Sequence, residues 1–179
     1  MKSILTLCIA AILLTSCESK EKLDRETALS ILKKENPYPK PITEEIYIAD
    51  PVDANRLLDA GLEDQGLITV QRTQSLNNVG EPLISFTEKA EPYLLPVNDE
   101  KIQQVKIADE VIEEVIGVRM EDDGNRAVVE YKTTFSNITP FSELSKIDLE
   151  KENIRRVDLV LYDYGWRTDK SADQKRTTR

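Results

Sequence analysis

The chain of 179 residues contains no histidine and only two cysteines, Cys8 and Cys17. The lack of histidine excludes Ser-His-Asp and Cys-His catalytic arrangements, and it excludes sites in which histidine binds zinc or haem iron. The sequence also has neither a glycine-rich phosphate loop nor a nucleophile elbow. Any chemistry must therefore depend on carboxylates, lysines, hydroxyl groups and tyrosines.

The clearest apolar segment lies at the amino terminus. Ile4 to Leu14 spans roughly ten residues, about half of what an α-helix needs to cross a bilayer. Lys2 precedes this segment and small residues follow it, which is the order of a secretory signal peptide. We therefore expect residues 1–16 to direct export and to be removed.

The end of this segment resembles a lipid-attachment motif. Leu14-Thr15-Ser16-Cys17 is similar to the lipobox of bacterial lipoproteins. The resemblance implies cleavage before Cys17, a diacylglycerol on its thiol and an acyl chain such as palmitate on the new amino terminus, so that the protein binds the membrane through Cys17. Glu18 directly after the anchor favours the outer membrane, at its periplasmic or surface face. The alternatives are an ordinary secreted protein with a chance cysteine and a cytoplasmic protein with a buried amino-terminal helix.

Cysteine usage and charge limit the cofactors and partners of the mature chain. Cys8 leaves with the signal and Cys17 carries lipid, so no thiol remains for catalysis, metal binding or a disulfide. The chain has 33 acidic against 24 basic residues, and its net charge of −9 disfavours nucleic acid as a partner. The acidic segment Glu121 to Asn125 lacks the spacing of a calcium loop and favours a hairpin turn. We expect no metal and no cofactor.

Two helices are predicted in the first part of the mature chain. Asp24 is a suitable N-cap for a helix from Arg25 to Glu35. Asp50, followed by Pro51, starts a second helix, which Gly66 ends. Short strands are expected at three places, Ile42–Ile48, Leu67–Thr73 and Leu83–Phe86.

This order of elements, with the segments Gly66-Leu67-Ile68 and Phe86-Thr87-Glu88-Lys89-Ala90, resembles the winged-helix domain, in which a helix leads into a two-stranded wing. The resemblance covers residues 24–95 and implies a small helical lobe. The helix that would enter a DNA groove is acidic, so the resemblance implies a scaffold and no DNA binding. Its charged residues are Asp53, Asp59, Glu63 and Asp64 against Arg56.

After Pro96 the pattern changes to the period of two that is typical of strands. Gly117 indicates a bulge or bend in one of them, and the turn at residues 122–125 joins two neighbours. The predicted strands contain Val105 and Ile107, Val111–Met120, Ala127–Phe135 and Ile154–Trp166.

The last predicted strand has apolar or aromatic side chains on both faces. Tyr162, Tyr164 and Trp166 share one face with Val160. This face either packs on a helix or on the amino-terminal lobe, or it forms an open row that stacks sugar rings or peptides. The three aromatic residues are therefore the candidate ligand-binding residues.

Together these patterns predict an α+β protein with a small winged-helix-like helical lobe followed by an antiparallel β-sheet lobe. We expect a non-catalytic binding or assembly module with a protein or glycan partner in the envelope. The alternative is a hydrolase of cell-wall or imported polymers that uses carboxylates alone. Neighbouring acids such as Glu113 and Glu114 disfavour it, because they point to opposite faces of a strand. The predicted parts are a signal peptide (1–16), a lipidated tether (17–23), the winged-helix-like lobe (24–96), the sheet lobe (97–167) and a disordered basic tail (168–179).

Overall fold

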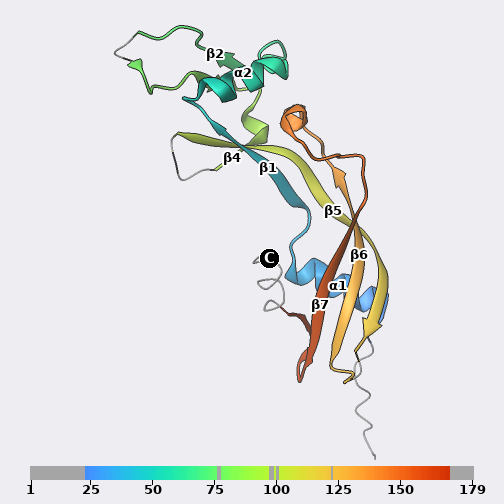
Figure 1. Cartoon of the computed structure of the whole chain (residues 1–179). Helices are drawn as coiled ribbons and strands as arrows, with labels where there is room; N and C mark the ends of the chain where they lie inside the picture. The colour runs from blue at the N-terminus through green and yellow to red at the C-terminus, as the bar shows by residue number, and fades with distance from the viewer. Residues whose placement is uncertain (1–22, 76–77, 97–98, 100, 122, 170–179) are drawn as a thin grey trace, which may run out of the picture.

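The computed structural model describes residues 23–75, 78–96, 99, 101–121 and 123–169. The predicted signal peptide, Cys17 and most of the basic tail lie outside these residues. The described part is an α+β protein with a large curled antiparallel sheet, as predicted (Figure 1). Its elements are α1 (Arg25–Glu35), β1 (Lys40–Tyr47), α2 (Pro51–Asp59), β2 (Ile68–Val70), β3 (Ile84–Phe86), the 3₁₀ turn η2 (Glu91–Tyr93), β4 (Leu94–Leu95), β5 (Ile102–Met120), β6 (Arg126–Ser136), the 3₁₀ turn η3 (Pro140–Leu144), β7 (Asn153–Tyr162) and β8 (Gly165–Thr168).

Both helices begin where the sequence places them. Asp24 accepts a hydrogen bond from the backbone N–H of Thr27 at 2.8 Å, which satisfies one of the free donors at the start of α1. Asp50 accepts one from the N–H of Val52 at 2.8 Å, and Pro51 occupies the first turn of α2. The predicted bounds of α1 are confirmed.

One long strand organises the main sheet. The sheet order is β1-β5-β6-β7-β8, and β4 also pairs with β5. The 19 residues of β5 extend about 60 Å at the usual rise of roughly 3.3 Å per residue. The first half of β5 pairs with β1 and β4, and the second half pairs with β6. The sequence pattern predicted two separate strands in this region, whereas the structure has one continuous strand from Ile102 to Met120.

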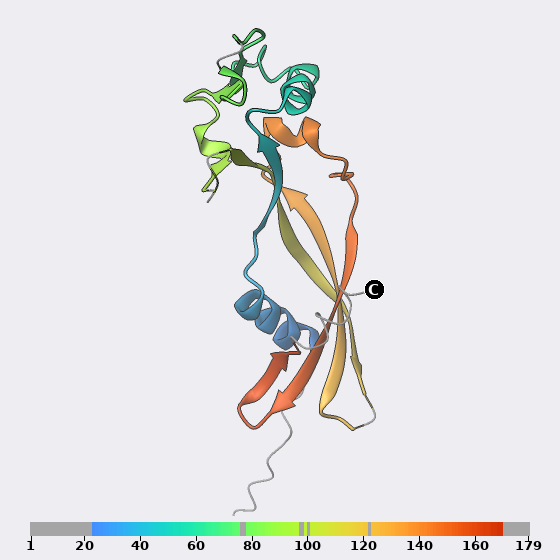
Figure 2. The same ribbon diagram turned by 60° about the vertical axis from the view of Figure 1, so that its left-hand side comes forward.

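The molecule is elongated and has a hydrophobic core near each end (Figures 1 and 2). The α2 core surrounds Phe141 and includes α2, the β2–β3 hairpin and the first half of β5. In the α1 core, α1 packs into the curve formed by the second half of β5 and strands β6 to β8. The buried members of the α1 core are Leu23, Ala28, Leu32, Val115, Ala127, Val129, Tyr131, Val157, Leu159 and Trp166.

The two cores do not divide the chain at residue 96. Leu32 of α1 is fully buried in the same core as residues from the carboxyl-terminal half, such as Val157. Ile46 of β1 belongs instead to the α2 core, together with Val105 of β5. The chain therefore crosses from one core to the other between α1 and β1, at the proline-rich segment 37–41.

Glycines shape two hairpins and a bulge in the main sheet. The predicted turn after β5 is confirmed, because Gly124 has φ 66° and its N–H bonds the carbonyl of Glu121 at 2.9 Å. The pairing register of β5 shifts between Val115 and Gly117, which confirms the predicted irregularity. The prediction of one strand from Ile154 to Trp166 is wrong. Gly165, at φ 104°, allows a tight turn after Tyr162, and the chain returns as β8.

Candidate binding site

Three buried polar side chains and one exposed arginine lie between the two cores. We call this region the waist; it contains Asp109, Glu110, Thr133 and Arg155. Asp109 is 6% exposed, Glu110 2% and Thr133 0%. Because successive residues of a strand point to opposite faces, the carboxylates of Asp109 and Glu110 lie on opposite faces of β5. Each therefore needs its own set of donors.

The carboxylate of Glu110 is held by three donors on one oxygen. Its Oε1 accepts from Thr133 Oγ1 at 2.7 Å, and from Arg155 Nε at 3.0 Å and Nη2 at 2.8 Å. The bonds to Glu110 raise the pKa of the Arg155 guanidinium above its ordinary value. This ion pair joins β5 to β7 across β6.

The carboxylate of Asp109 is held on the other face. Its Oδ2 accepts from Lys106 Nζ at 2.6 Å and from Asn137 Nδ2 at 2.9 Å. Burial raises the pKa of Asp109, but the bonds from Lys106 and Asn137 outweigh this and hold the pKa below its ordinary value. Both waist carboxylates thus have structural partners.

A pocket opens beside the waist, where the chain crosses from α1 to β1. Its volume is about 360 Å³, within the range of small-ligand sites. Two phenol groups meet there, since the hydroxyl oxygens of Tyr38 and Tyr131 are 3.5 Å apart. We call it the waist pocket; its lining residues are Asn36, Pro37, Tyr38, Lys40, Tyr131, Arg156 and Val157.

The waist pocket offers neutral hydroxyl groups and cations. Burial, and secondly the hydrogen bond with Tyr131, raises the pKa of Tyr38 far above its ordinary value, so this phenol stays protonated. The charges of Glu110 and Arg155 also act on Tyr38, with opposite signs. Lys40 and Arg156 line the pocket, and no carboxylate is among the described residues that line it. These groups can bind the hydroxyl, carbonyl or anionic oxygens of a ligand.

The three aromatic residues predicted to bind a ligand do not form one row. The turn after Tyr162 sends Trp166 into the α1 core, where it is 3% exposed, as the burial alternative expected for it. Tyr162 and Tyr164 stay outside, with exposed fractions of 45% and 69%. Their rings are stacked, with centroids 5.4 Å apart and planes 9° apart.

Sequence reasoning missed the residues of the waist pocket. Tyr38 lies between two prolines, Pro37 and Pro39, which only indicated the end of a helix. Tyr131 belongs to the alternating pattern of β6, and nothing local distinguishes it from a core residue. The proximity of Tyr38 and Tyr131, 93 positions apart, arises only in the folded chain.

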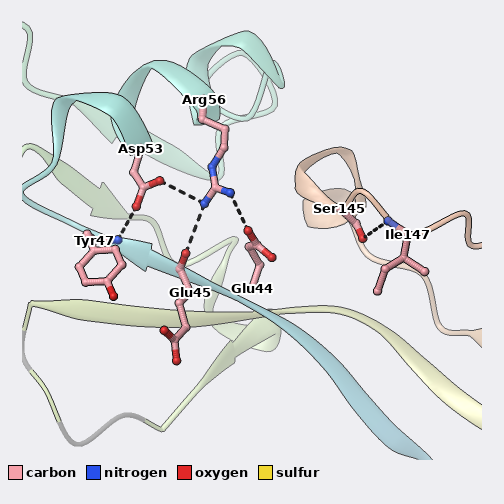
Figure 3. A network of polar contacts seen from close by, with 7 residues as sticks. All are labelled: Glu44, Glu45, Tyr47, Asp53, Arg56, Ser145 and Ile147. Atoms are coloured by element: carbon pink, nitrogen blue, oxygen red, sulfur yellow. Dashed lines mark hydrogen bonds and ion pairs between the residues drawn. The ribbon is translucent and has the colours of Figure 1, made fainter. Parts of the chain in front are cut away.

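A second polar network ties α2 to β1 (Figure 3). Arg56 donates to Glu44 Oε1 at 2.6 Å and to the carbonyl of Glu45 at 3.3 Å, and it pairs with Asp53 at 3.1 Å. Asp53 also accepts from the N–H of Tyr47 at 2.7 Å. A broader hollow of about 550 Å³ lies beside Arg56, between α2 and Glu143 of η3. The two Nη atoms of Arg56 make these bonds, whereas its buried Nε has no hydrogen-bond partner among the described residues. The evident role of the network is to hold α2 on the sheet.

The described residues form neither a metal-binding cluster nor a membrane-crossing helix. In that part of the chain, no group of three or more cysteines or carboxylates could hold a metal ion. No helix formed by the described residues has the length and apolar character needed to cross a membrane.

Comparison with known proteins finds no relative. No protein-family model matches the chain, and no match was found among curated proteins or among solved structures.

Proposed function

We propose that this protein is a lipid-anchored binding module of a bacterial envelope, held in the outer membrane through Cys17, which binds a protein or glycan partner in the waist pocket. The observation that carries the proposal is the pocket itself. It combines paired phenol hydroxyls with lining cations, and it adjoins a fixed Glu110–Arg155 ion pair. These groups can hold a polar ligand by hydrogen bonds and charge alone, without proton transfer between the protein and the ligand.

The anchor is supported by the lipobox-like residues Leu14 to Cys17 and by the apolar segment before them. Mass spectrometry of the native protein tests it. We expect a chain that begins at Cys17 with an added diacylglycerol and acyl chain. Replacing Cys17 by alanine should release the protein from the membrane fraction. An intact Met1 with an unmodified thiol at Cys17 would contradict the anchor.

We also propose that α2 and the β2–β3 hairpin serve as a winged-helix-like scaffold. The β2–β3 hairpin follows α2 and Gly66 in the chain, as the wing follows the helix in a winged-helix domain. Thr87, directly after β3, joins the two ends of the hairpin. The hydroxyl of Thr87 donates to the carbonyls of Gly66 and Leu67, at 2.8 and 3.2 Å. This scaffold lacks α1, which packs in the other core.

Nuclear magnetic resonance titration of residues 18–179 tests the pocket. The probes are soluble peptidoglycan fragments as the glycan and an acidic peptide as the protein surrogate. We expect one probe to shift the signals of Tyr38, Lys40 and Tyr131 in a saturable way. Tyr38→Phe removes one hydroxyl from the pocket and should weaken that binding by about tenfold, the value of one good hydrogen bond.

Tyr93→Phe is the matched control, because Tyr93 packs on Phe141 in the α2 core, away from the waist pocket. It should leave the affinity unchanged. Shifts that cluster elsewhere, or equal losses in both variants, would count against the waist pocket. Release of cleaved glycan during the titration would favour the hydrolase instead.

A further inference from the structure

The stacked tyrosines lie at one end of the elongated molecule. Tyr162 and Tyr164 flank the tip of the β7–β8 hairpin, and the β5–β6 turn lies beside them, since the N–H of Leu161 bonds the carbonyl of Asn125 at 2.8 Å. We call this the hairpin end (Figure 2). The α2 core occupies the opposite end (Figure 1). Exposed tyrosine rings suit the boundary between water and lipid, because the ring is apolar and its hydroxyl is polar.

A small hollow beside Tyr164 carries groups that bind phosphate. It has a volume of about 190 Å³ and lies between α1 and the β7–β8 hairpin. Lys34 and Arg167 line it, as do the hydroxyl-bearing residues Thr27 and Ser30. The guanidinium of Arg167 lies 5.3 Å from the ring centroid of Tyr164 and also pairs with Glu35 at 3.3 Å. Cations and hydroxyl donors at one place are the usual partners of phosphate oxygens.

The length of chain before the fold determines which end can meet a membrane. Leu23 is buried in the α1 core, and only six peptide units separate it from Cys17. Even fully extended, this segment spans about 20 Å. A lipid on Cys17 would therefore keep the α1 core within about 20 Å of the bilayer. The hairpin end belongs to that core, whereas the α2 core lies at the far end of the sheet.

The charges at the hairpin end select the kind of lipid. Glu121 and Asp123 lie on the β5–β6 turn, and Asp163 lies between the two tyrosines. With Glu35, these acids balance the cations of this end, which are Lys34, Arg119, Arg126 and Arg167, so a strongly anionic surface would not be attracted. A zwitterionic lipid such as phosphatidylethanolamine offers phosphate to the cations and ammonium to the acids.

From these observations we infer that the hairpin end rests on the phospholipid surface, with Tyr162 and Tyr164 at the level of the headgroups and a headgroup phosphate in the hollow formed by Lys34 and Arg167. This inference rests on the proposed lipid anchor. It adds an orientation, in which the waist pocket and the α2 core face away from the bilayer.

The test imposes the anchor chemically, so that it does not depend on lipidation in the cell. The chain from Cys17 to Arg179 has one thiol, which is coupled to a maleimide lipid in nanodiscs of phosphatidylethanolamine and phosphatidylcholine. The tyrosines are labelled with fluorotyrosine, and their signals are assigned by single Tyr→Phe variants. A nitroxide on the lipid headgroup then broadens the fluorine signals of nearby rings.

We expect several-fold broadening for Tyr162 and Tyr164 and none for Tyr47. Tyr47 is the internal control, since it is 49% exposed but belongs to β1 beside α2. Equal broadening of Tyr47, or sharp signals from Tyr162 and Tyr164, would overturn the inference. Because the anchor is attached chemically, such a result would not bear on whether the native protein is lipidated. Mass spectrometry tests that question separately.

A charge reversal tests the phosphate contact. Lys34→Glu should reduce the broadening of Tyr164, because a carboxylate would repel the phosphate. Lys33→Glu is the matched control, since this neighbouring lysine of α1 does not line the hollow. If both variants reduce the broadening equally, the contact is only a general charge effect and the proposed phosphate site is wrong.

Discussion

Arg155 donates two hydrogen bonds to one oxygen of the buried Glu110 carboxylate, from Nε at 3.0 Å and from Nη2 at 2.8 Å. The side chain of Arg155 is 49% exposed, whereas that of Glu110 is only 3% exposed. A solvated cation thus neutralises a buried anion at the waist. We expect this pair to stabilise the connection between the two cores.

Arg155→Ala should lower the free energy of unfolding by about 1–3 kcal/mol, because the buried Glu110 side chain then loses two of its three hydrogen-bond donors. Urea unfolding measures this loss. Arg156→Ala is the matched control, since Arg156 pairs with Glu130 at the surface, with 64% and 36% of the two side chains exposed. It should cost no more than about 0.5 kcal/mol. Equal losses in the two variants would show that the waist pair has no special role.

Trp166→Ala should cost about 3–5 kcal/mol, because it leaves a cavity between α1 and the sheet. The loss is measured by thermal or urea unfolding of residues 18–179. Tyr164→Ala, two residues earlier, removes a ring that is 69% exposed and should change stability by about 0.5 kcal/mol or less. A stable Trp166→Ala variant would contradict the placement of this ring in the α1 core.

Acidification should destabilise the protein in part through Asp109. The folded pKa of Asp109 is lowered, so the unfolded chain binds the proton more readily. The contribution of Asp109 is therefore complete above its unfolded pKa, which is about 3.9, and is lost as the pH falls below that value. Unfolding free energies measured across this range should fall less steeply for Asp109→Asn than for the wild type.

The exposed Asp59 provides the control for this pH series. Asp59→Asn should follow the wild-type profile, because the bonds from Lys106 and Asn137 to Asp109 remain in this variant. A profile of Asp109→Asn that runs parallel to the wild type would exclude Asp109 as a source of acid sensitivity.

Arg56→Met should loosen α2, because Arg56 joins that helix to Glu44 and to the backbone of Glu45 on β1 (Figure 3). We expect hydrogen exchange of the α2 amides to accelerate by up to about tenfold, and global stability to fall by about 1 kcal/mol. Arg72→Met breaks the more exposed pair with Glu63 and should leave α2 exchange unchanged. Unaltered exchange in Arg56→Met would mean that apolar packing alone holds the helix.

The local elements could be predicted because their signals lie within a few residues of one another. Asp24 and Asp50 cap helices whose donors are two or three positions away. Gly124 is needed for a turn between neighbouring strands. The break after Tyr162 was missed because the alternating pattern of apolar and aromatic residues continues through Tyr164 to Trp166, although Gly165 permits the chain to turn back.

The waist pocket could not be predicted, since its groups come from distant parts of the chain. Tyr38 meets Tyr131, and Glu110 meets Arg155, only after β5, β6 and β7 have paired in register. A single residue of slip in that pairing would turn these side chains to the opposite face. The pairing register of these strands cannot be read from the spacing of residues in the sequence.

The sequence by itself determined the helix starts, the hairpin after β5 and the α+β class. Its lack of histidine also excluded the catalytic and metal sites that need this residue. These depend on short-range hydrogen bonds, on backbone preferences and on composition. Only the tertiary structure decided that α1 joins the carboxyl-terminal strands, that Trp166 is buried while Tyr164 is exposed, and that two phenols meet at the waist. Those outcomes depend on the curl and register of a sheet, which bring together residues that are far apart along the chain.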